Sequence, residues 1–464
     1  MDTPIDARRL APTNDNRWSA HFRATLALGI PLIGAQLAQL GIHTTDVMII
    51  GRLGAEQLAA MVLSAQFLFT ILIFGSGFAI AVIPLVAQAY GRGDVVSVRR
   101  SLRMGLWVVI GFWIIMQPAF FKAEQILLFA QQKPEVAKLA HGYIMIGQFG
   151  VLPALLFNVM RSLVSAIGKA GIILNVTIAT LVMNAIFAYI LVLGHFGFPA
   201  MGLEGAAIVS VAVQTAGFLF ILAFVQRREE TRRYEIFVRF WKPDWHALLE
   251  VIRLGFPISV TILAEVSLFT VASLLMGYIG TIELAAHGIA LQWASIAFMI
   301  PLGLSQAATV RVGVAHGQGD YQGLVRASIT VLVLACAISA VGSVLFASMP
   351  QFLGSWFLDV NSPEVLAYAG PLIVVAGLFQ LVDGLQVIAN GLLRGLKDAR
   401  VPMIMALIAY WPIGFFLAWA FAFPLGFGGI GIWFGFLVGL AAAAVMLCAR
   451  FYLLLRREGV TAGA

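Results

Sequence analysis

Three carboxylates lie where carboxylates are rare, inside long apolar stretches of the chain. Asp46, Glu265 and Asp383 interrupt such stretches, whereas nearly all other acidic residues fall in the termini, in polar connections or at the ends of apolar runs. A charged side chain at the centre of a membrane-spanning helix costs about 2.5–3.5 kcal/mol on insertion scales, and it usually faces the helix bundle interior, a partner or water. Each of the three is therefore a candidate functional residue.

The surroundings of the three acids differ. The neighbours Val266, Leu268 and Phe269 of Glu265 offer nothing that neutralises its charge. Asp383 has Gln380 three residues before it and Gln386 three residues after it, which places all three polar groups on one helical face and predicts that this face lines a cavity. Asp46 follows two threonines nearer the end of its apolar stretch, so a water-exposed helix end is the alternative reading.

The sequence places no lysine or arginine in the middle of an apolar stretch as a fixed partner for these acids. A buried carboxylate without such a partner either takes up a proton or holds a mobile cation. If one cluster binds H⁺ or Na⁺ in one state and a cationic substrate in another, mutual exclusion produces exchange. Glu265 and Asp383 are the expected ligands if the cation is Na⁺, with Asp46 as a third coupling candidate.

Other embedded residues have two readings each. For Asn184, Gln66 and Gln292, one interpretation is contact with a ligand and the other is an interhelical hydrogen bond. His43, near Asp46, titrates or is a neutral packed imidazole. Pro31 and Pro257 lie in the expected first turns of their spans, where proline is tolerated, so a hinge is one reading and a structurally neutral position the other.

The elements that must position these residues are membrane spans. Of 464 residues, 61% are hydrophobic and 11% charged, against about 25% charged in soluble domains. The apolar stretches are long enough, at about 1.5 Å per residue, to cross a hydrocarbon layer of about 30 Å. We expect twelve transmembrane helices, at residues 26–50, 58–83, 102–121, 136–158, 171–194, 204–225, 251–277, 284–310, 327–349, 364–389, 401–422 and 429–451.

Basic residues predict the orientation of the spans. If the first span begins in the cytoplasm, 25 of the 29 lysines and arginines fall in the tails and connections on the cytoplasmic side and 4 on the other side. This asymmetry is typical of cytoplasmic connections and places both termini in the cytoplasm. The net charge of +7 then faces anionic membrane lipids and requires no nucleic-acid partner.

An internal duplication groups the spans. Residues 29–100 laid over 255–326, at a constant offset of 226, give 19 identities in 72 positions. A repeat six helices long predicts an all-α membrane protein with two six-helix lobes related by a pseudo-two-fold axis along the membrane normal, and with the substrate path between them. We expect a tail at 1–23, lobes at 24–225 and 251–453, a cytoplasmic linker at 226–250 and a tail at 454–464. The polar residues 1–23 do not resemble a cleavable signal peptide.

The sequence lacks the motifs of several classes of protein. No Gly-x-x-x-x-Gly-Lys-Ser/Thr loop for ATP and no His-Glu-x-x-His cluster for zinc is present. The expected connections are too short to hold a catalytic domain, so we expect no enzyme and no cofactor. A membrane-embedded enzyme would need a reactive constellation that the spans do not contain.

The sequence resembles the multidrug and toxic compound extrusion (MATE) family, and most closely its bacterial NorM-type branch. The resemblance covers nearly all of the chain after residue 23 and rests on the six-plus-six organisation, on acids in spans one, seven and ten, and on three motifs. These are QAYGRGD at 88–94, HGQGD at 316–320 and GLLRGLKD at 391–398. It implies a multi-pass antiporter of the bacterial inner membrane that exports amphipathic, often cationic, compounds against Na⁺ or H⁺.

By matching context, the resemblance gives Glu265 and Asp383 the family's cation-site positions and Asp46 the position of its amino-lobe acid. The chain departs from many relatives at Phe379, where they have a tyrosine, and at Ala188, where they often have a polar residue. Both departures leave Na⁺ versus H⁺ open. The alternative function is a lipid-linked or polysaccharide flippase of the same superfamily, which we expect to have a cationic cavity lining.

Overall fold

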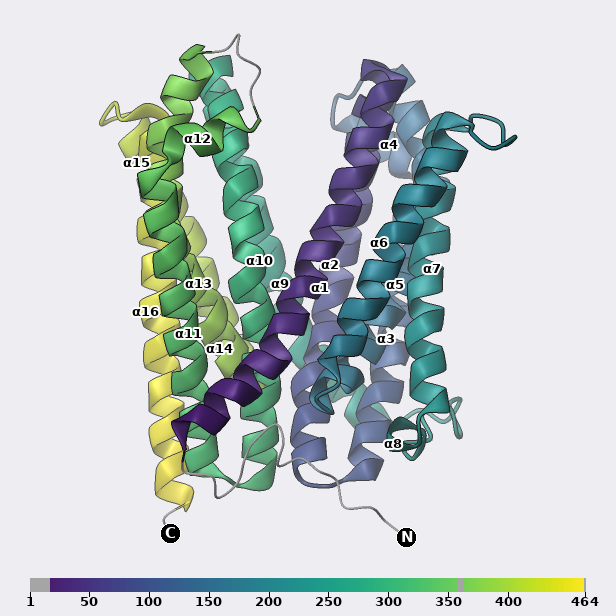
Figure 1. Ribbon diagram of the computed structural model, residues 1–464, viewed down its shortest axis with the longest axis vertical. Helices are drawn as coiled ribbons and strands as arrows, with labels where there is room; N and C mark the ends of the chain where they lie inside the picture. The colour runs from purple at the N-terminus through teal and green to yellow at the C-terminus, as the bar shows by residue number, and fades with distance from the viewer. Residues whose placement is uncertain (1–16, 358–362, 463–464) are drawn as a thin grey trace. The chain divides into compact units, whose positions relative to one another are not determined.

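The computed structural model describes residues 17–357 and 363–462 and is shown in Figure 1. Within these residues twelve helices are long and apolar enough to cross a membrane, which confirms the expected number. They are α1 (Trp18–Ile50), α2 (Ala55–Gly91), α3 (Val95–Phe121), α5 (Pro134–Ala166), α6 (Ala170–Leu193), α7 (Gly202–Arg227), α9 (Trp245–Ile279), α10 (Thr281–Gln318), α11 (Tyr321–Ser348), α13 (Pro363–Gly395), the segment formed by α14 (Arg400–Ile408), η3 (Ala409–Phe415) and α15 (Phe416–Ala422), and α16 (Gly428–Ala462).

Short helical pieces join the long helices. They are η2 (Gly51–Leu53), α4 (Ala123–Phe129), α8 (Glu229–Arg232) and α12 (Pro350–Ser355), and the described residues contain no strand. Most long helices extend beyond the apolar stretch that predicted them. In Figure 1, α4 and α8 lie at opposite ends of the same group of helices, α2, α3, α5, α6 and α7.

Contacts divide the chain into two compact units. Unit 1 comprises Met1–Ile33 and Val260–Ala464, and unit 2 comprises Gly34–Ser259. The chain therefore passes from one unit to the other inside two helices, after Ile33 in α1 and after Ser259 in α9. These two points are 226 residues apart, which is the offset of the sequence repeat.

The same repeat relates the close contacts at the two crossing points. A Cβ atom on Gly77 of α2 would lie 2.5 Å from the backbone nitrogen of Ser259, and one on Gly303 of α10 would lie 2.7 Å from the Cα atom of Ile33. Gly303 follows Gly77 by 226 residues. Each crossing point therefore packs backbone to backbone against a helix of its own unit, and only glycine fits there.

Pro31 and Pro257 do not lie in first turns, as the sequence had suggested. The helices begin at Trp18 and Trp245, so both prolines are interior to their helices. An interior proline removes one backbone hydrogen bond and favours a bend. Each lies two residues before the point at which its helix changes unit.

The core of unit 1 includes residues of the helices that carry the two acids of its half. Buried apolar residues of α9, α10, α13, η3 and α16 form one cluster, which includes Leu268, Phe379, Tyr410 and Trp433. The η3 segment is a π-helical stretch inside an otherwise α-helical span. Such stretches are rare and often mark functional sites, because the extra residue per turn redirects the side chains.

Candidate functional site

Asp383 is enclosed in unit 1 without a hydrogen bond. Its side chain, on α13, is 2% exposed, and its Oδ1 atom has no hydrogen-bond partner. Gln386, on the same face of α13, is fully buried, and its Oε1 atom also lacks a partner. Two buried oxygen acceptors on one helical face, both unsatisfied, suit a bound proton or a hard cation, which prefers oxygen ligands.

Glu265 of α9 is the second acid of this site. It is partly buried and lies within electrostatic range of Asp383 and of Arg394, the penultimate residue of α13. The sequence had placed Arg394 in a cytoplasmic connection, away from the acids. In the structure Arg394 belongs to the last turn of α13, and its charge interacts favourably with that of Glu265.

Tyr410 is a site residue that sequence reasoning missed. It belongs to η3, is fully buried, and its hydroxyl accepts a hydrogen bond from Gln386 Nε2. The phenol lies within electrostatic range of Glu265, Asp383 and Arg394. The site therefore contains a tyrosine hydroxyl, supplied by the π-helical stretch, although position 379 is a phenylalanine.

The signal for Tyr410 was present in the sequence repeat. Tyr410 stands 226 residues after Asn184, at the offset that relates the two halves, and both lie in the fifth long helix of their half. A search for polar residues at repeat-related positions would have found it.

Phe379 and Gln380 support the site without facing it as ligands. Phe379 is buried, and its ring packs edge-on against Trp433 and Phe269, with centroid distances of 5.5 and 5.9 Å. Gln380 Nε2 donates to the carbonyl oxygen of Ala294 at 2.9 Å. Gln380 thus joins α13 to α10 through an interhelical hydrogen bond.

His287 is a buried titratable residue near the site that the structure holds neutral. The indole Nε1–H of Trp433 donates to His287 Nδ1 at 3.2 Å, so Nδ1 is an acceptor and the proton resides on Nε2. That atom lies 3.2 Å from Ser273 Oγ. Because both ring nitrogens are engaged, His287 takes up no proton without losing the Trp433 hydrogen bond.

The acid of the first half has a different setting. Asp46, on α1 within unit 2, is partly buried, and Asn184 Nδ2 donates to its Oδ1 atom at 2.7 Å. Asn184 is fully buried, and its Oδ1 atom has no hydrogen-bond partner. The structure therefore brings these two sequence-derived candidates together, with one amide oxygen left to accept from a proton donor or to contact a cation.

Three of the weaker candidates are not joined to these acids. The side chains of His43 and Gln66 are exposed, and that of Gln292 is partly buried. Among the described residues no side-chain hydrogen bond links any of the three to Asp46, Glu265 or Asp383. They remain candidates for contact with a ligand only.

Two arginines are embedded, against the expectation that no basic residue lies within a span. Arg311 of α10 is fully buried and donates to the carbonyl oxygen and Nδ1 of His21, at 3.1 and 3.0 Å, and to Thr25 Oγ1. Arg161 of α5 donates to Gln36 Oε1 at 3.1 Å. Both lie near the end of a helix that continues beyond its predicted apolar stretch, and both join α1 to another helix.

The geometry defines an α-helical, multi-pass membrane protein with acidic groups enclosed in each of its two units. The MatE family model matches residues 31–190 and 257–420, one match in each half of the chain. The chain belongs to this family.

Named relatives and solved structures agree with this assignment. A protein of Agrobacterium fabrum named "Probable multidrug resistance protein NorM" is 66% identical over 454 residues, covering 97% of this chain and 98% of the relative. A Rhizobium meliloti protein of the same name is 62% identical, with 97% of each chain covered. The eukaryotic MATE transporter AtDTX14 has the same fold, with a TM-score of 0.86, 20% identity and coverage of 96% and 98%.

Proposed function

We propose that the protein is a secondary active multidrug exporter that exchanges amphipathic, often cationic, compounds for Na⁺ or H⁺. The observation that carries the proposal is the enclosed acid pair of unit 1, in which Asp383 Oδ1 has no hydrogen-bond partner. The names of the relatives, multidrug resistance proteins, supply the substrate class. The protein works in the bacterial inner membrane, with both termini in the cytoplasm, and uses no ATP.

In this proposal the coupling ion occupies the site formed by Glu265, Asp383, Gln386 and Tyr410. The two carboxylates repel each other electrostatically, and Arg394 offsets part of their charge. A proton on Asp383, or a Na⁺ ion between the side-chain oxygens, removes the remaining negative charge. A cationic drug competes for the same charge, so that ion and drug bind in turn.

Alternating access requires the two units to move relative to each other. Pro31 and Pro257 are the proposed hinges, since each lies two residues before the point at which α1 or α9 changes unit. Asp46 and Asn184 are the second proton or cation candidate, within unit 2.

The flippase alternative gains no support from the embedded arginines. Arg161 and Arg311 are hydrogen-bonded to α1 side chains and backbone. They therefore serve helix packing, and neither provides the free cationic lining that a polyanionic substrate needs.

The test is drug efflux from proteoliposomes under one imposed gradient at a time, either Na⁺ or pH. We expect efflux of a fluorescent cationic dye to follow at least one gradient. Efflux driven by neither gradient contradicts the antiport proposal, and efflux driven by ATP alone contradicts the whole class.

A further inference from the structure

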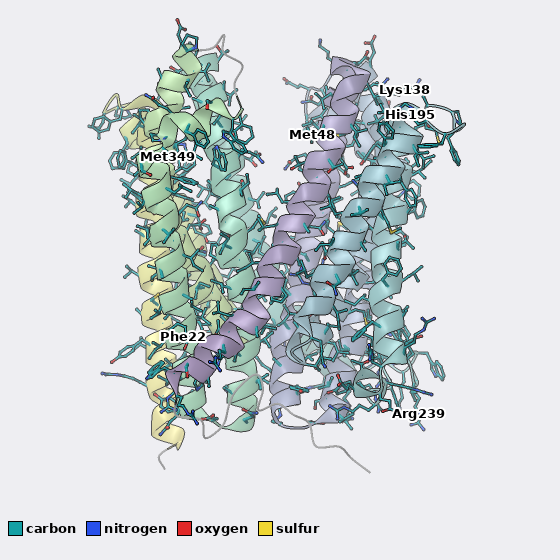
Figure 2. The ribbon with its side chains drawn as sticks, in the orientation of Figure 1. Phe22, Met48, Lys138, His195, Arg239 and Met349 are labelled. Carbon is teal, nitrogen blue, oxygen red and sulfur yellow. The ribbon has the colours of Figure 1, made fainter. Side chains whose placement is uncertain are left out.

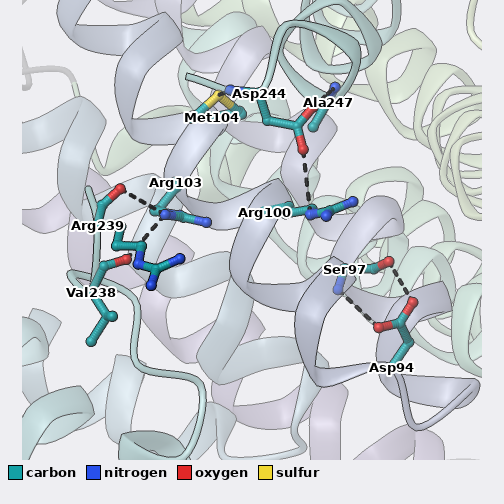
Figure 3. A network of polar contacts seen from close by, with 9 residues as sticks. All are labelled: Asp94, Ser97, Arg100, Arg103, Met104, Val238, Arg239, Asp244 and Ala247. Atoms are coloured by element: carbon teal, nitrogen blue, oxygen red, sulfur yellow. Dashed lines mark hydrogen bonds and ion pairs between the residues drawn. The ribbon is translucent and has the colours of Figure 1, made fainter. Parts of the chain in front are cut away.

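The connection between α7 and α9, residues 228–244 and here called the linker, is fixed along α3. Three side chains spaced four residues apart on α3 donate hydrogen bonds to four carbonyl groups of the linker. Arg99 Nε donates to Tyr234 O at 2.7 Å, Arg103 Nη1 to Val238 O at 3.0 Å and Arg239 O at 2.8 Å, and Trp107 Nε1 to Phe240 O at 3.0 Å. Figure 3 shows the Arg103 contacts together with the ion pair of Arg100 and Asp244.

The linker backbone is strained where α3 holds it. Glu235 and Arg239 have φ angles of 46° and 56°, in the left-handed region that non-glycine residues rarely adopt. The arginine donors of α3 compensate for this strain by binding the carbonyls at or next to these residues. The carbonyl of Arg239 is thereby turned towards α3, while its side chain is exposed at the end of unit 2 opposite Lys138 (Figure 2).

From residue 234 of the linker to residue 253 of α9, acidic and basic side chains differ in whether they have partners. The three acids of this stretch have partners, since Glu235 pairs with Arg99 at 2.9 Å, Asp244 pairs with Arg100 at 3.4 Å, and Glu250 also has a partner. Between residues 234 and 253 the basic side chains are different. Those of Arg239, Lys242 and Arg253 are exposed, and none of them has an ion pair or side-chain hydrogen bond within the described part of the chain.

Large aromatic side chains lie among these unpaired cations. Trp241 is 76% exposed and Trp245, the first residue of α9, is 67% exposed. Trp245, Leu249, Arg253 and Phe256 are spaced four, four and three residues apart, so they share one exposed face of a helix that crosses the membrane. That face continues from the linker into the apolar part of α9.

This combination fits one layer of the membrane. Tryptophan is enriched at the level of lipid headgroups, where its ring is partly apolar and its N–H is hydrated. Lysine and arginine near a helix end extend to the same level. Free phosphate would match the charges but leave the two tryptophans and the apolar face of α9 in water.

We propose that Arg239, Lys242 and Arg253, with Trp241 and Trp245, form a binding surface for the headgroups of anionic phospholipids. We call it the basic linker surface. Because α3 holds the linker, lipid bound there anchors unit 2 and the first part of α9 at the membrane interface. Movement of unit 1 then begins beyond Ser259, the last α9 residue of unit 2.

The test measures quenching of tryptophan fluorescence in nanodiscs that contain phosphatidylcholine with an equal fraction of brominated phosphatidylglycerol or brominated phosphatidylcholine. The signal of the two surface tryptophans is the difference between the unaltered protein and its W241F/W245F variant. We expect a local preference for the anionic lipid of about fivefold or more, the effect of a single basic residue near a membrane surface. In an R239Q/K242Q/R253Q variant, whose changes are all exposed, we expect this preference to disappear.

The matched control is K122Q/K133Q/K138Q, which removes three exposed lysines elsewhere in unit 2, and it should retain the preference. Equal quenching by the two brominated lipids in the unaltered protein overturns the proposal. So does a preference that persists in R239Q/K242Q/R253Q. The measurement uses no ion gradient or drug, so its outcome is independent of the proposed transport function.

Discussion

The two halves of the chain share a scaffold but carry different chemistry. The scaffold features recur at the 226-residue offset, as in Gly77 with Gly303, and in Asp94 with Asp320 at the start of α3 and α11. The acids do not recur, since position 272, opposite Asp46, is an alanine, and position 39, opposite Glu265, is a glutamine. Duplication therefore preserved what packs the helices, while each half acquired its own buried charge.

The difference between the two sites is one of hydrogen bonding. Asp46 accepts a hydrogen bond from Asn184, which stabilises its ionised form. Asp383 has no such donor and lies near a second carboxylate. We therefore propose that the site of the second half has the larger share of ion coupling.

The largest expected effect comes from neutralising the acids. Asp383→Asn and Glu265→Gln should each lower gradient-driven efflux at least about a hundredfold, equivalent to about 2.7 kcal/mol, because the charge that ion and drug share is reduced. Asp46→Asn should have a smaller effect. The measurement is initial dye efflux from proteoliposomes with equal amounts of folded protein. Unchanged efflux in both unit 1 variants would contradict the assignment of Glu265 and Asp383 to the ion site. A larger loss of efflux in Asp46→Asn would show that the site of the first half is the more important one.

Because the two halves share a scaffold, we expect substitutions at the two close glycine contacts to destabilise the protein equally. Gly77→Ala and Gly303→Ala should each destabilise the protein by at least about 2–3 kcal/mol, because the added methyl group meets backbone atoms that cannot move aside. Thermal unfolding in detergent measures the effect. Gly111→Ala and Gly342→Ala are matched controls in α3 and α11, where a Cβ atom meets nothing within 4 Å. A marked difference between Gly77→Ala and Gly303→Ala would show that the scaffold is not equivalent in the two halves.

Substitutions at the repeat-related residues Asn184 and Tyr410 should change efflux in different ways, because each residue belongs to a different site. Tyr410→Phe removes one hydroxyl and should weaken activation by the coupling ion about fivefold, the value of a hydrogen bond of about 1 kcal/mol. Asn184→Leu should alter the dependence of efflux on pH through Asp46, with less effect on the ion requirement of unit 1. Ion-activation and pH curves of efflux distinguish these outcomes.

Tyr368→Phe is the control for Tyr410→Phe, because the Tyr368 hydroxyl accepts from the backbone of Gly429 at 3.0 Å, outside the acid cluster. An ion-activation curve of Tyr410→Phe identical to that of Tyr368→Phe would exclude the phenol from the site.

The smallest effects are expected at the two helix caps. Asp94 accepts from the backbone nitrogen of Ser97 at 3.0 Å, and Asp320 from that of Gly323 at 2.8 Å. Replacing either aspartate with alanine should cost about 1 kcal/mol. The Ser97 hydroxyl and backbone N–H hold the pKa of Asp94 below its ordinary value. The pKa of an aspartate in the unfolded chain is about 3.9. The stabilisation by the Asp94 carboxylate is therefore present above that pH, and it is lost as the pH falls through the lower pKa of the folded state.

Unfolding temperatures at pH 7 and pH 3 test this sign. The difference between the unaltered protein and Asp94→Ala should be larger at pH 7. A difference that grows towards pH 3 would contradict the cap interpretation.

The sequence by itself determined the number of spans, the repeat and the two acids of unit 1, because burial of charge in an apolar stretch is visible in composition alone. It also indicated Asn184, though not its partner. The sequence predicted the ends of the helices less well. Pro31 and Pro257 lie inside helices because α1 and α9 begin at Trp18 and Trp245, in segments that contain polar residues and that hydropathy therefore leaves outside the spans.

Only the tertiary structure decided which side chains meet. Arg394, at the end of another helix, interacts electrostatically with Glu265, and Tyr410 of the π-helical stretch lies within electrostatic range of both acids. Likewise, the left-handed residues of the linker lie where arginines of α3 bind carbonyl groups at or next to them. Sequence pattern records the local environment of each residue, whereas these contacts depend on long side chains and on backbone irregularities that only the packing of distant segments can sustain.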